Sequence, residues 1–423
     1  DPENLRKAYD SEMLPYDKVR EEFFEGYREL YERIVNTVKS ALKDNASSYA
    51  QRFLGRLMFL YFLQRKGWLK GDRSFINKIN DYLELNRLFY ESLNRKNGEE
   101  GIPFLNGSLF EREEYLTNGV EKELAMKMNS IFYDARNFFN RYNFTVDETT
   151  PLEVEVSIDP LLLGTVLENL LEEKERGEKG TFYTPVNEIG FMCRRAIAAW
   201  LGLEEGVQQR NGELRFVDGL QRYVDELKKR RDEREIREFR EKLLSLKILD
   251  PAVGSGGFLV VMMQTILQLI QEVEEAVGWK TDLEQYKRRI IPNLYGFDIE
   301  PEAVEIARLR IWLSLIVDQK QPEPLPNLDL NIVTISDSLE LPKGVQTALG
   351  EFGKELGYLS LVEDIEAVKA RYLNEHDAMK KNALRKRIEE LRQEFVKRTG
   401  LAIRVGPPVE FFMPSLADIV VMN

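Results

Sequence analysis

The chain has very few of the residues that form crosslinks, ligate metals or carry protons. Its 423 residues include one cysteine, Cys193, and one histidine, His376. A single cysteine excludes an intramolecular disulfide and favours a reducing, cytoplasmic location. Cys193 lies in an apolar helical pattern at 189–201, which predicts a buried thiol. His376 stands among charged residues, which predicts a solvated helix face, so neither histidine catalysis nor a metal site is expected.

Long apolar runs are also lacking. No run of 18 apolar residues occurs and no secretory signal opens the chain, so we expect no membrane partner. Hydrophobic residues make up 43% and charged residues 31%, which is typical of globular proteins with a large core. The net charge of −12 is unfavourable for contacts with DNA phosphates, although it leaves room for a local basic face. The basic clusters at 228–231 and 380–387 lie in helical patterns of mixed charge, which favours solvated faces.

The chain does contain a glycine-rich turn between a predicted strand and a predicted helix. Residues 250–259 read Asp-Pro-Ala-Val-Gly-Ser-Gly-Gly-Phe-Leu, after the apolar run 246–249 and before the apolar segment 260–270. Glycines let the backbone approach a ligand, the acid can hold a cation, and the helix N-terminus favours an anion. The spacing fits neither a dinucleotide fingerprint nor a P-loop. A tight turn without any ligand is the alternative interpretation.

Three further strands are predicted at 294–297, 330–335 and 418–423, and polar residues stand at the carboxyl end of each. The strand at 294–297 leads into Asp298 and Glu300. An acid at the end of the second strand is placed to accept hydrogen bonds from ribose hydroxyls. With helices between them, the four strands predict a doubly wound α/β sheet that binds a ligand at its carboxyl edge.

These segments resemble the S-adenosylmethionine-dependent DNA adenine-N6 methyltransferases in their γ order of motifs. Residues 250–258 are similar to the cofactor loop D-P-A-C-G-S-G-x-F, with valine in place of cysteine. The Phe-Asp-Ile-Glu-Pro run at 297–301 is similar to the second motif of that family. Residues 180–185, Gly-Thr-Phe-Tyr-Thr-Pro, resemble the upstream motif, and 418–423 resemble the strand that leads into N-P-P-Y.

The resemblance covers about residues 160 to 423 and implies a Rossmann-like methyltransferase core. It implies transfer of a methyl group from S-adenosylmethionine to adenine N6 in a specific double-stranded DNA sequence, within a restriction–modification or phage-defence system. It assigns Asp298 to the ribose, Asp337 to the adenine amino group of the cofactor and Asn423 to catalysis. The Asn423 oxygen would accept a hydrogen bond from the target amine. The implied cofactor-binding residues are Thr181, Tyr183, Thr184, Pro185, Asp250, Pro251, Gly254, Ser255, Gly256, Phe258, Asp298, Ile299, Asp337 and Ser338.

Residues 1–150 are predicted to form an α-helical domain that precedes the methyltransferase core at 151–423. This part resembles the helical spacer of single-chain type IIG restriction–modification enzymes and of related phage-defence methyltransferases. Gly67 is expected to end the second of its helices. The helical patterns lie at 19–38, 49–68 and 75–93.

Two charged segments, 204–247 and 355–399, are predicted as helical insertions in the core. The second is expected to form one or two long helices between 365 and 396. Because the N-P-P-Y motif begins at Asn423, its remaining residues and a target-recognition region are expected outside this sequence. No convincing nuclease motif of the form P-D-x(n)-[DE]-x-K occurs, so an endonuclease activity of the complete protein stays open, as do other subunits of a defence system.

Three alternatives to this function remain. A similar final motif serves cytosine N4, although the γ order favours adenine. Methylation of RNA or of protein glutamine is a more distant possibility. The third alternative is a module that binds the cofactor without transferring its methyl group.

Overall fold

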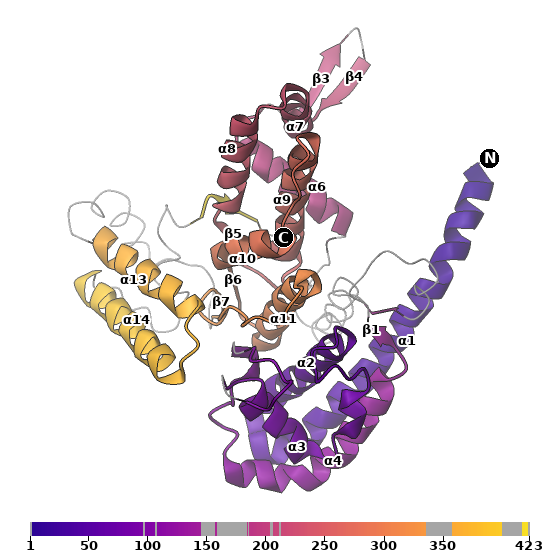
Figure 1. Ribbon diagram of the computed structural model, residues 1–423, viewed down its shortest axis with the longest axis vertical. Helices are drawn as coiled ribbons and strands as arrows, with labels where there is room; N and C mark the ends of the chain where they lie inside the picture. Colours follow the sequence, from indigo (N-terminus) through magenta and orange to yellow (C-terminus); the bar gives the residue numbers. More distant parts are fainter. Residues whose placement is uncertain are drawn as a thin grey trace. The chain divides into compact units, whose positions relative to one another are not determined.

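The computed structural model describes ten stretches of the chain, which fall into two compact units. The first unit comprises Asp1–Phe182 with Arg308–Leu325, and the second Tyr183–Ala307 with Pro326–Asn423. Helices dominate both units, and the second contains a four-stranded sheet (Figure 1). The stretches described are 2–95, 98–105, 108–144, 157–158, 184, 186–203, 206–210, 213–335, 358–399 and 417–421.

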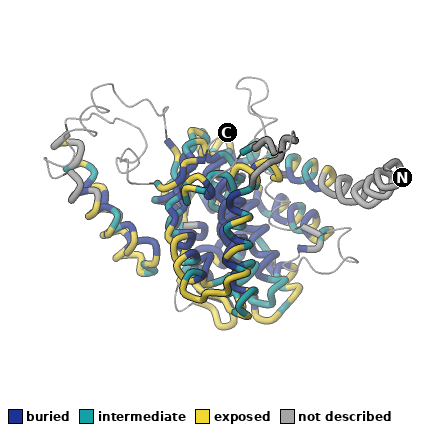
Figure 2. Tube along the Cα trace, turned by 90° about the horizontal axis from the view of Figure 1, so that it is seen from above, coloured by how far each residue is buried: buried dark blue, intermediate teal, exposed yellow. Residues whose placement is uncertain are grey.

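The first unit is a group of helices around the apolar helix α2. In α2 nearly every side chain from Tyr49 to Leu63 is buried, and α1 and α4 pack against it. Figure 2 shows how buried and exposed residues are distributed along the chain. The helices and strands of this unit are α1 (Pro2–Leu42), η1 (Lys43–Asn45), α2 (Ala46–Arg65), η2 (Phe75–Lys78), α3 (Tyr82–Arg87), η3 (Leu88–Ser92), η4 (Ser108–Phe110), α4 (Asn118–Phe139), β1 (Asn143–Phe144) and β2 (Ser157–Ile158).

The expected end of α2 is confirmed. Gly67 adopts a left-handed φ of 72°, and the Trp68 N–H donates to the Leu63 carbonyl at 3.0 Å. This reversal satisfies a carbonyl of the last turn, as glycine does after many helices.

The helix expected over residues 75–93 is instead three short pieces, η2, α3 and η3. Asp81 interrupts the pattern, since its backbone is extended and its side chain accepts the Glu84 N–H at 2.8 Å. An aspartate in this position starts a new helix rather than continuing the old one.

The second unit is built on a parallel sheet with strand order β7-β6-β5-β8. The chain runs from β5 to β6 and β7 on one side and then places β8 on the other side of β5. The prediction of a Rossmann-like α/β sheet preceded by helices is confirmed, and β5/β8 is its topological switch point, where such sheets bind ligands. The strands are β5 (Ile248–Asp250), β6 (Leu294–Asp298), β7 (Ile332–Thr334) and β8 (Ile419–Val420).

Helices cover the sheet and connect its strands. Leu259 of α9 lies over Gly296 on one face, while Tyr295 of β6 points to the other face and donates to Glu366 of α13 at 3.2 Å. Cys193 of α6 is fully buried, as predicted. The helices of this unit are α6 (Val186–Trp200), α7 (Gly219–Arg230), α8 (Glu233–Leu244), α9 (Gly257–Ala276), α10 (Leu283–Ile290), η6 (Ile291–Asn293), α11 (Pro301–Asp318), α13 (Tyr358–Leu373) and α14 (Ala378–Thr399), of which α11 continues into the first unit.

The insertion at 204–247 is only partly helical, so the prediction for it was wrong at its start. An antiparallel hairpin, β3 (Gly206–Arg210) and β4 (Glu213–Val217), precedes α7 and α8. Asn-Gly lies between the two strands in the sequence, and that pair is a strong signal for a two-residue hairpin turn. The abundance of charge concealed this signal.

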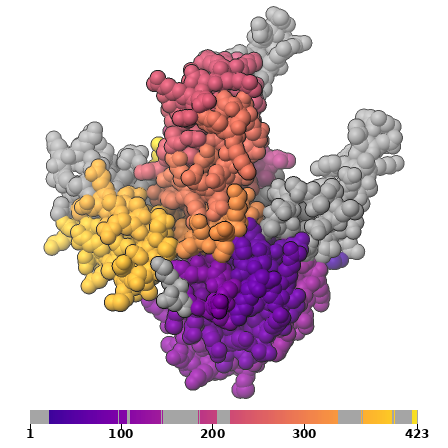
Figure 3. All heavy atoms as spheres, viewed as in Figure 1, coloured from indigo at the N-terminus to yellow at the C-terminus, as the bar shows by residue number. Residues whose placement is uncertain are grey.

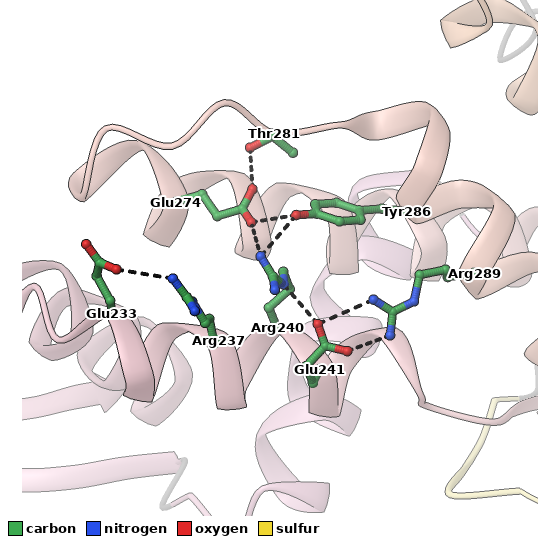
Figure 4. A network of polar contacts seen from close by, with 8 residues as sticks. All are labelled: Glu233, Arg237, Arg240, Glu241, Glu274, Thr281, Tyr286 and Arg289. Carbon is green, nitrogen blue, oxygen red and sulfur yellow. Dashed lines mark hydrogen bonds and ion pairs between the residues drawn. The ribbon is translucent and has the colours of Figure 1, made fainter.

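A buried carboxylate connects the helices that precede and follow β5 (Figure 4). Glu274 of α9 accepts hydrogen bonds from Arg240 of α8 at 3.1 Å, from Tyr286 of α10 at 2.6 Å and from Thr281 at 2.9 Å. Because four groups share one desolvated site, α8, α9 and α10 are held in register at the start of β5.

The second insertion forms two helices, α13 and α14, whose outer surface is visible in Figure 3. Asn327 fastens their connection, since its amide donates to the Tyr372 and Glu375 carbonyls at 2.8 and 3.0 Å. Two expectations are corrected here. Lys381 is only 2% exposed because its ammonium donates to Asn327 at 2.8 Å, and His376 lies half-buried in the connection rather than on a helix face.

Among the described helices, none is long and apolar enough to cross a membrane.

Candidate functional site

Two acids end neighbouring strands at the carboxyl edge of the sheet. Asp250 closes β5 and is 1% exposed, while Asp298 closes β6 and is half-buried. Asp250 pairs in register with Gly296, so Asp298 lies two residues further along the adjacent strand. The carboxyl groups of Asp250 and Asp298 therefore lie close together at the carboxyl edge of the sheet.

The environment of Asp250 opposes its ionisation. The pKa of this carboxyl is raised to about 7, mainly by burial and to a smaller extent by the nearby charge of Asp298, although the Ala252 N–H at 3.1 Å favours the charged form. A buried acid of this kind is poised to accept a cation, which would restore its charge.

The glycine loop after β5 is fastened to β6 by its backbone. The Val253 N–H donates to the Phe297 carbonyl at 3.0 Å, and the Gly254 N–H donates to Oδ2 of Asp298 at 2.8 Å. Within the loop, the Gly256 N–H donates to the Val253 carbonyl at 2.7 Å, directly before α9 begins. The loop thus has a defined position before any ligand arrives.

The two left-handed glycines of the loop serve different purposes. Gly254 has a φ of 49° and a Cβ at this position would meet nothing within 4 Å. Gly256 has a φ of 83°, and a Cβ there would approach the Ala307 Cβ of α11 to 3.0 Å. Gly256 therefore permits close packing of helix on loop, and Gly254 exposes backbone to open space where a ligand can approach.

Asp298 and Glu300 differ in their surroundings. Asp298 Oδ1 accepts the N–H of Glu300 at 3.0 Å, so the Asp298 carboxylate already bonds to two backbone donors. Glu300 precedes Pro301, the first residue of α11, which is a favoured position for proline. Ile299, between them, is 49% exposed. Each Asp298 oxygen retains a second lone pair that can accept a further hydrogen bond.

Strand β8 brings the last part of the chain to the same edge. The Val421 N–H donates to the Leu249 carbonyl at 2.9 Å, so β8 continues beside β5 up to the residue before Asp250. Asp418 fixes the other end of β8 by accepting the Lys247 N–H at 2.9 Å. The switch point is therefore formed by the glycine loop that follows β5 and by Val421 at the end of β8.

The structure gathers most of the predicted site residues that it describes. Ser255 and Phe258 are 5% and 7% exposed, so their side chains pack in the interior and stabilise the loop. Thr184 is half-buried and stands two residues before α6, a helix that packs against α9 and β8. Pro251 is half-buried beside Asp250 in the loop. The predicted residues that lie outside the described part of the chain are Thr181, Tyr183, Pro185, Asp337, Ser338 and Asn423.

Two residues near the site were not anticipated. Burial and, to a smaller extent, the charge of Asp250 raise the pKa of the Cys193 thiol to about 12, so Cys193 lies near the acid. Gly296 of β6 lies directly under the loop, where a Cβ would come within 2.7 Å of Val253 Cγ2. A glycine inside an apolar strand is the sequence signal for such a close approach. No group of three or more histidine, cysteine, aspartate or glutamate residues in the described part could hold a metal ion.

Part of the chain is similar to known DNA methyltransferases. Residues 226–324 match the family model "MmeI, DNA-methyltransferase domain". The chain is 28% identical over 422 residues to a protein of Methanocaldococcus jannaschii named "Putative type II restriction enzyme and methyltransferase", with 92% of this chain and 35% of the relative covered. It is 23% identical over 280 residues to "DNA methyltransferase A" of Bacillus subtilis, with 62% and 27% covered.

Two solved structures are also similar. The type IIL restriction–modification enzyme MmeI in complex with DNA shares 20% identity at a TM-score of 0.43, over 68% of this chain and 36% of that one. The DrdV–DNA complex shares 14% identity at a TM-score of 0.36, over 77% and 26%.

The predicted resemblance to DNA methyltransferases of restriction–modification systems is confirmed. The matched family segment contains the glycine loop, Asp298 and all of α11. The chain spans about a third of the length of the first curated relative. The choice of adenine N6 stays a prediction.

Proposed function

We propose that this chain is the cofactor-binding part of an S-adenosylmethionine-dependent DNA methyltransferase that modifies adenine N6 in a specific duplex sequence. The observation that carries the proposal is the glycine loop, fastened to β6 between Asp250 and Asp298 at the switch point of the sheet. In this proposal residues 1–150 are the spacer domain and residues 151–423 the methyltransferase core, and the complete protein acts in the cytoplasm within a restriction–modification or phage-defence system.

The described residues suit the chemical groups of S-adenosylmethionine. Asp250 would hold the methionine ammonium, whose positive charge compensates the burial of the acid. The N-terminus of α9 favours the carboxylate, and the open space at Gly254 admits a close backbone contact. Asp298 would accept from the ribose hydroxyls, and the half-exposed Ile299 would contact the adenine ring. When bound, the cofactor supplies a methyl group on a sulfonium that leaves as a neutral thioether.

The target amine needs positioning more than it needs a strong base. Its lone pair is delocalised into the adenine ring, so an acceptor that holds the amine toward the methyl group favours the developing charge. Asn423 would supply that acceptor, since it follows Val421, whose backbone is bonded to β5. The base would leave the duplex to reach this site.

A labelled-cofactor assay tests the proposal and its alternatives together. The complete protein is incubated with duplex DNA and S-adenosylmethionine carrying tritium in its methyl group, and the labelled nucleoside is identified after digestion. We expect N6-methyladenine from the wild type and from Asp364→Ala, an exposed acid on α13, and much less label from Asp250→Ala at a cofactor concentration near the wild-type KM.

The remaining outcomes decide between the other functions. Label in N4-methylcytosine would transfer the proposal to cytosine. Bound cofactor without any transferred label would leave a binding module, and the enzyme proposal would be abandoned.

A further inference from the structure

The glycine loop packs closely on β6 because Gly296 has no side chain. Gly296 is the central residue of β6, and a Cβ built there would lie 2.7 Å from Cγ2 of Val253, 3.0 Å from its Cβ and 3.3 Å from Cδ1 of Leu259. Atoms of folded proteins do not approach this closely, so any side chain at this position must displace the loop or α9.

The backbone of Gly296 does not explain why a glycine stands there. Glycines with positive φ occur at Gly254 and Gly256, but Gly296 is not among them. Its extended conformation is open to every residue, and glycine inside a strand is unfavourable because it adds flexibility and packs nothing. The reason must therefore lie in packing, and the packing partner is Val253.

Val253 cannot easily give way. Its side chain is 3% exposed, and its N–H is bonded to Phe297 at 3.0 Å, one residue beyond Gly296. The next N–H of the loop is bonded to Asp298. Three consecutive residues of β6 thus determine where the loop lies: Gly296 by leaving space, Phe297 by its carbonyl and Asp298 by its carboxylate.

We infer that Gly296 is a positioning residue for cofactor binding, and that it acts through Val253. In this inference Gly296 contacts neither the cofactor nor the target base. It determines the distance between the loop and β6, and so the position of the Gly254 backbone that would contact the ligand. Positions 253 and 296 form a coupled pair, so a larger residue at one requires a smaller residue at the other. The inference rests on the proposed function, because it assumes that the loop binds S-adenosylmethionine.

A double-mutant cycle tests this coupling. We expect Gly296→Ala to weaken the binding of S-adenosylmethionine about tenfold or more, because a displacement near 1 Å can cost about 100-fold at a positioned site. Val253→Ala alone should change the affinity by less than about threefold, because its backbone bonds remain. Combining the two removes the 2.7 Å clash and leaves a 3.0 Å contact that a small shift relieves, so most of the affinity should return.

The matched control is Gly190→Ala in α6. A Cβ at Gly190 would meet only Val261 at 4.0 Å, an ordinary contact, so this change should leave the affinity unaltered. Calorimetric titration gives the affinity, and steady-state kinetics should show a raised KM for the cofactor with an unchanged KM for DNA in Gly296→Ala. A purely structural defect would not produce this separation.

The result that overturns the inference is a double variant no better than Gly296→Ala, or a Gly296→Ala protein that binds as the wild type does. If the wild type itself binds no S-adenosylmethionine, the proposed function fails, and the cycle is read from thermal unfolding of the same four proteins. Non-additive changes in Tm would then support the coupled pair, and additive changes would contradict it.

Discussion

At the scale of single residues, the site depends most on the buried charge of Asp250. Because its pKa is raised to about 7, this acid is partly protonated near neutral pH when no cation faces it. A cationic ligand binds the deprotonated form, so binding at lower pH must first remove a proton. The affinity for S-adenosylmethionine should therefore fall as pH drops below about 7 and reach a plateau above it.

The measurement is a cofactor titration at pH 8 and at pH 6. We expect the dissociation constant to rise about tenfold at the lower pH, since each pH unit below the pKa costs a factor of ten. Asp250→Asn, which cannot titrate, should bind weakly and equally at both values. A wild-type affinity that is independent of pH would show that Asp250 does not meet the cationic group.

A second residue-scale prediction separates Asp298 from Glu300. Asp298→Asn should lose more cofactor affinity than Glu300→Gln, because Asp298 both faces the predicted ribose position and holds the Gly254 N–H. Two isosteric amide variants compared in one titration series make the test. A greater loss in Glu300→Gln would reverse the assignment.

A third concerns Asn423, which lies outside the described residues. In the complete enzyme, Asn423→Ala should bind cofactor almost normally and reduce single-turnover methylation by on the order of 10²–10³, by analogy with the loss of one preorganised hydrogen-bonding group. If the variant kept more than about a tenth of the wild-type rate, Asn423 would not be the catalytic asparagine.

At the scale of elements, α2 of the first unit depends on a buried ion pair. Arg56 is 2% exposed and lies 3.0 Å from the Glu113 carboxylate, and it also donates to the carbonyls of Leu109 and Glu111 at 2.5 and 2.7 Å. Burial alone would raise the pKa of Glu113, but the charges of Arg56 and then Arg52 outweigh it and lower the pKa. Removing one partner of such a pair typically costs about 3–5 kcal/mol.

The sign of the pH dependence follows from that lowered pKa. Glu113 binds protons less readily in the folded state, so its stabilisation is complete above its unfolded value of 4.5 and is lost as pH falls through the lower folded pKa. Glu113→Gln should lower Tm at pH 7 and flatten the acid-side loss, whereas Glu123→Gln, an exposed control on α4, should change neither. Equal acid sensitivity of Glu113→Gln and wild type would contradict the assignment.

The elements that sequence patterns predicted well are those with continuous apolar character. The strands at 294–298 and 419–420, the long helix α9 and the turn at Gly67 all carry a strong local signal. The hairpin β3–β4 was missed because its alternation is obscured by charge. The helix expected at 75–93 was too long because one polar cap, Asp81, outweighs the surrounding apolar periodicity.

Local sequence patterns do not predict contacts between residues that are far apart in the chain. Nothing in the sequence pairs Val253 with Gly296, or Cys193 with Asp250, because these residues meet only when separate elements pack. The basic cluster at 380–387 predicts that Lys381 is solvated, but Lys381 is buried because its ammonium donates a hydrogen bond to Asn327. The sequence therefore predicts the motif residues of the site, whose roles stay a proposal, but not the residues that pack beneath them.

At the scale of the whole molecule, the division into units does not follow the predicted boundary at residue 150. The compact units assign Arg308–Leu325, and thus the second half of α11, to the first unit. The helical pattern of α11 is uninterrupted, so the sequence gives no signal for a division between residues 307 and 308. The two-domain arrangement with a spacer before the core stays part of the proposal.

The central claim is that the carboxyl edge formed by β5, β6 and β8 binds S-adenosylmethionine. Calorimetric titration at pH 8, where Asp250 is ionised, tests it most directly. We expect one binding site per chain in the wild type, unchanged binding in Asp364→Ala and a loss of about tenfold or more in Asp250→Ala, which lacks a charge-assisted contact. No binding by the wild type, or equal binding by wild type and Asp250→Ala, would show that this edge is not the cofactor site.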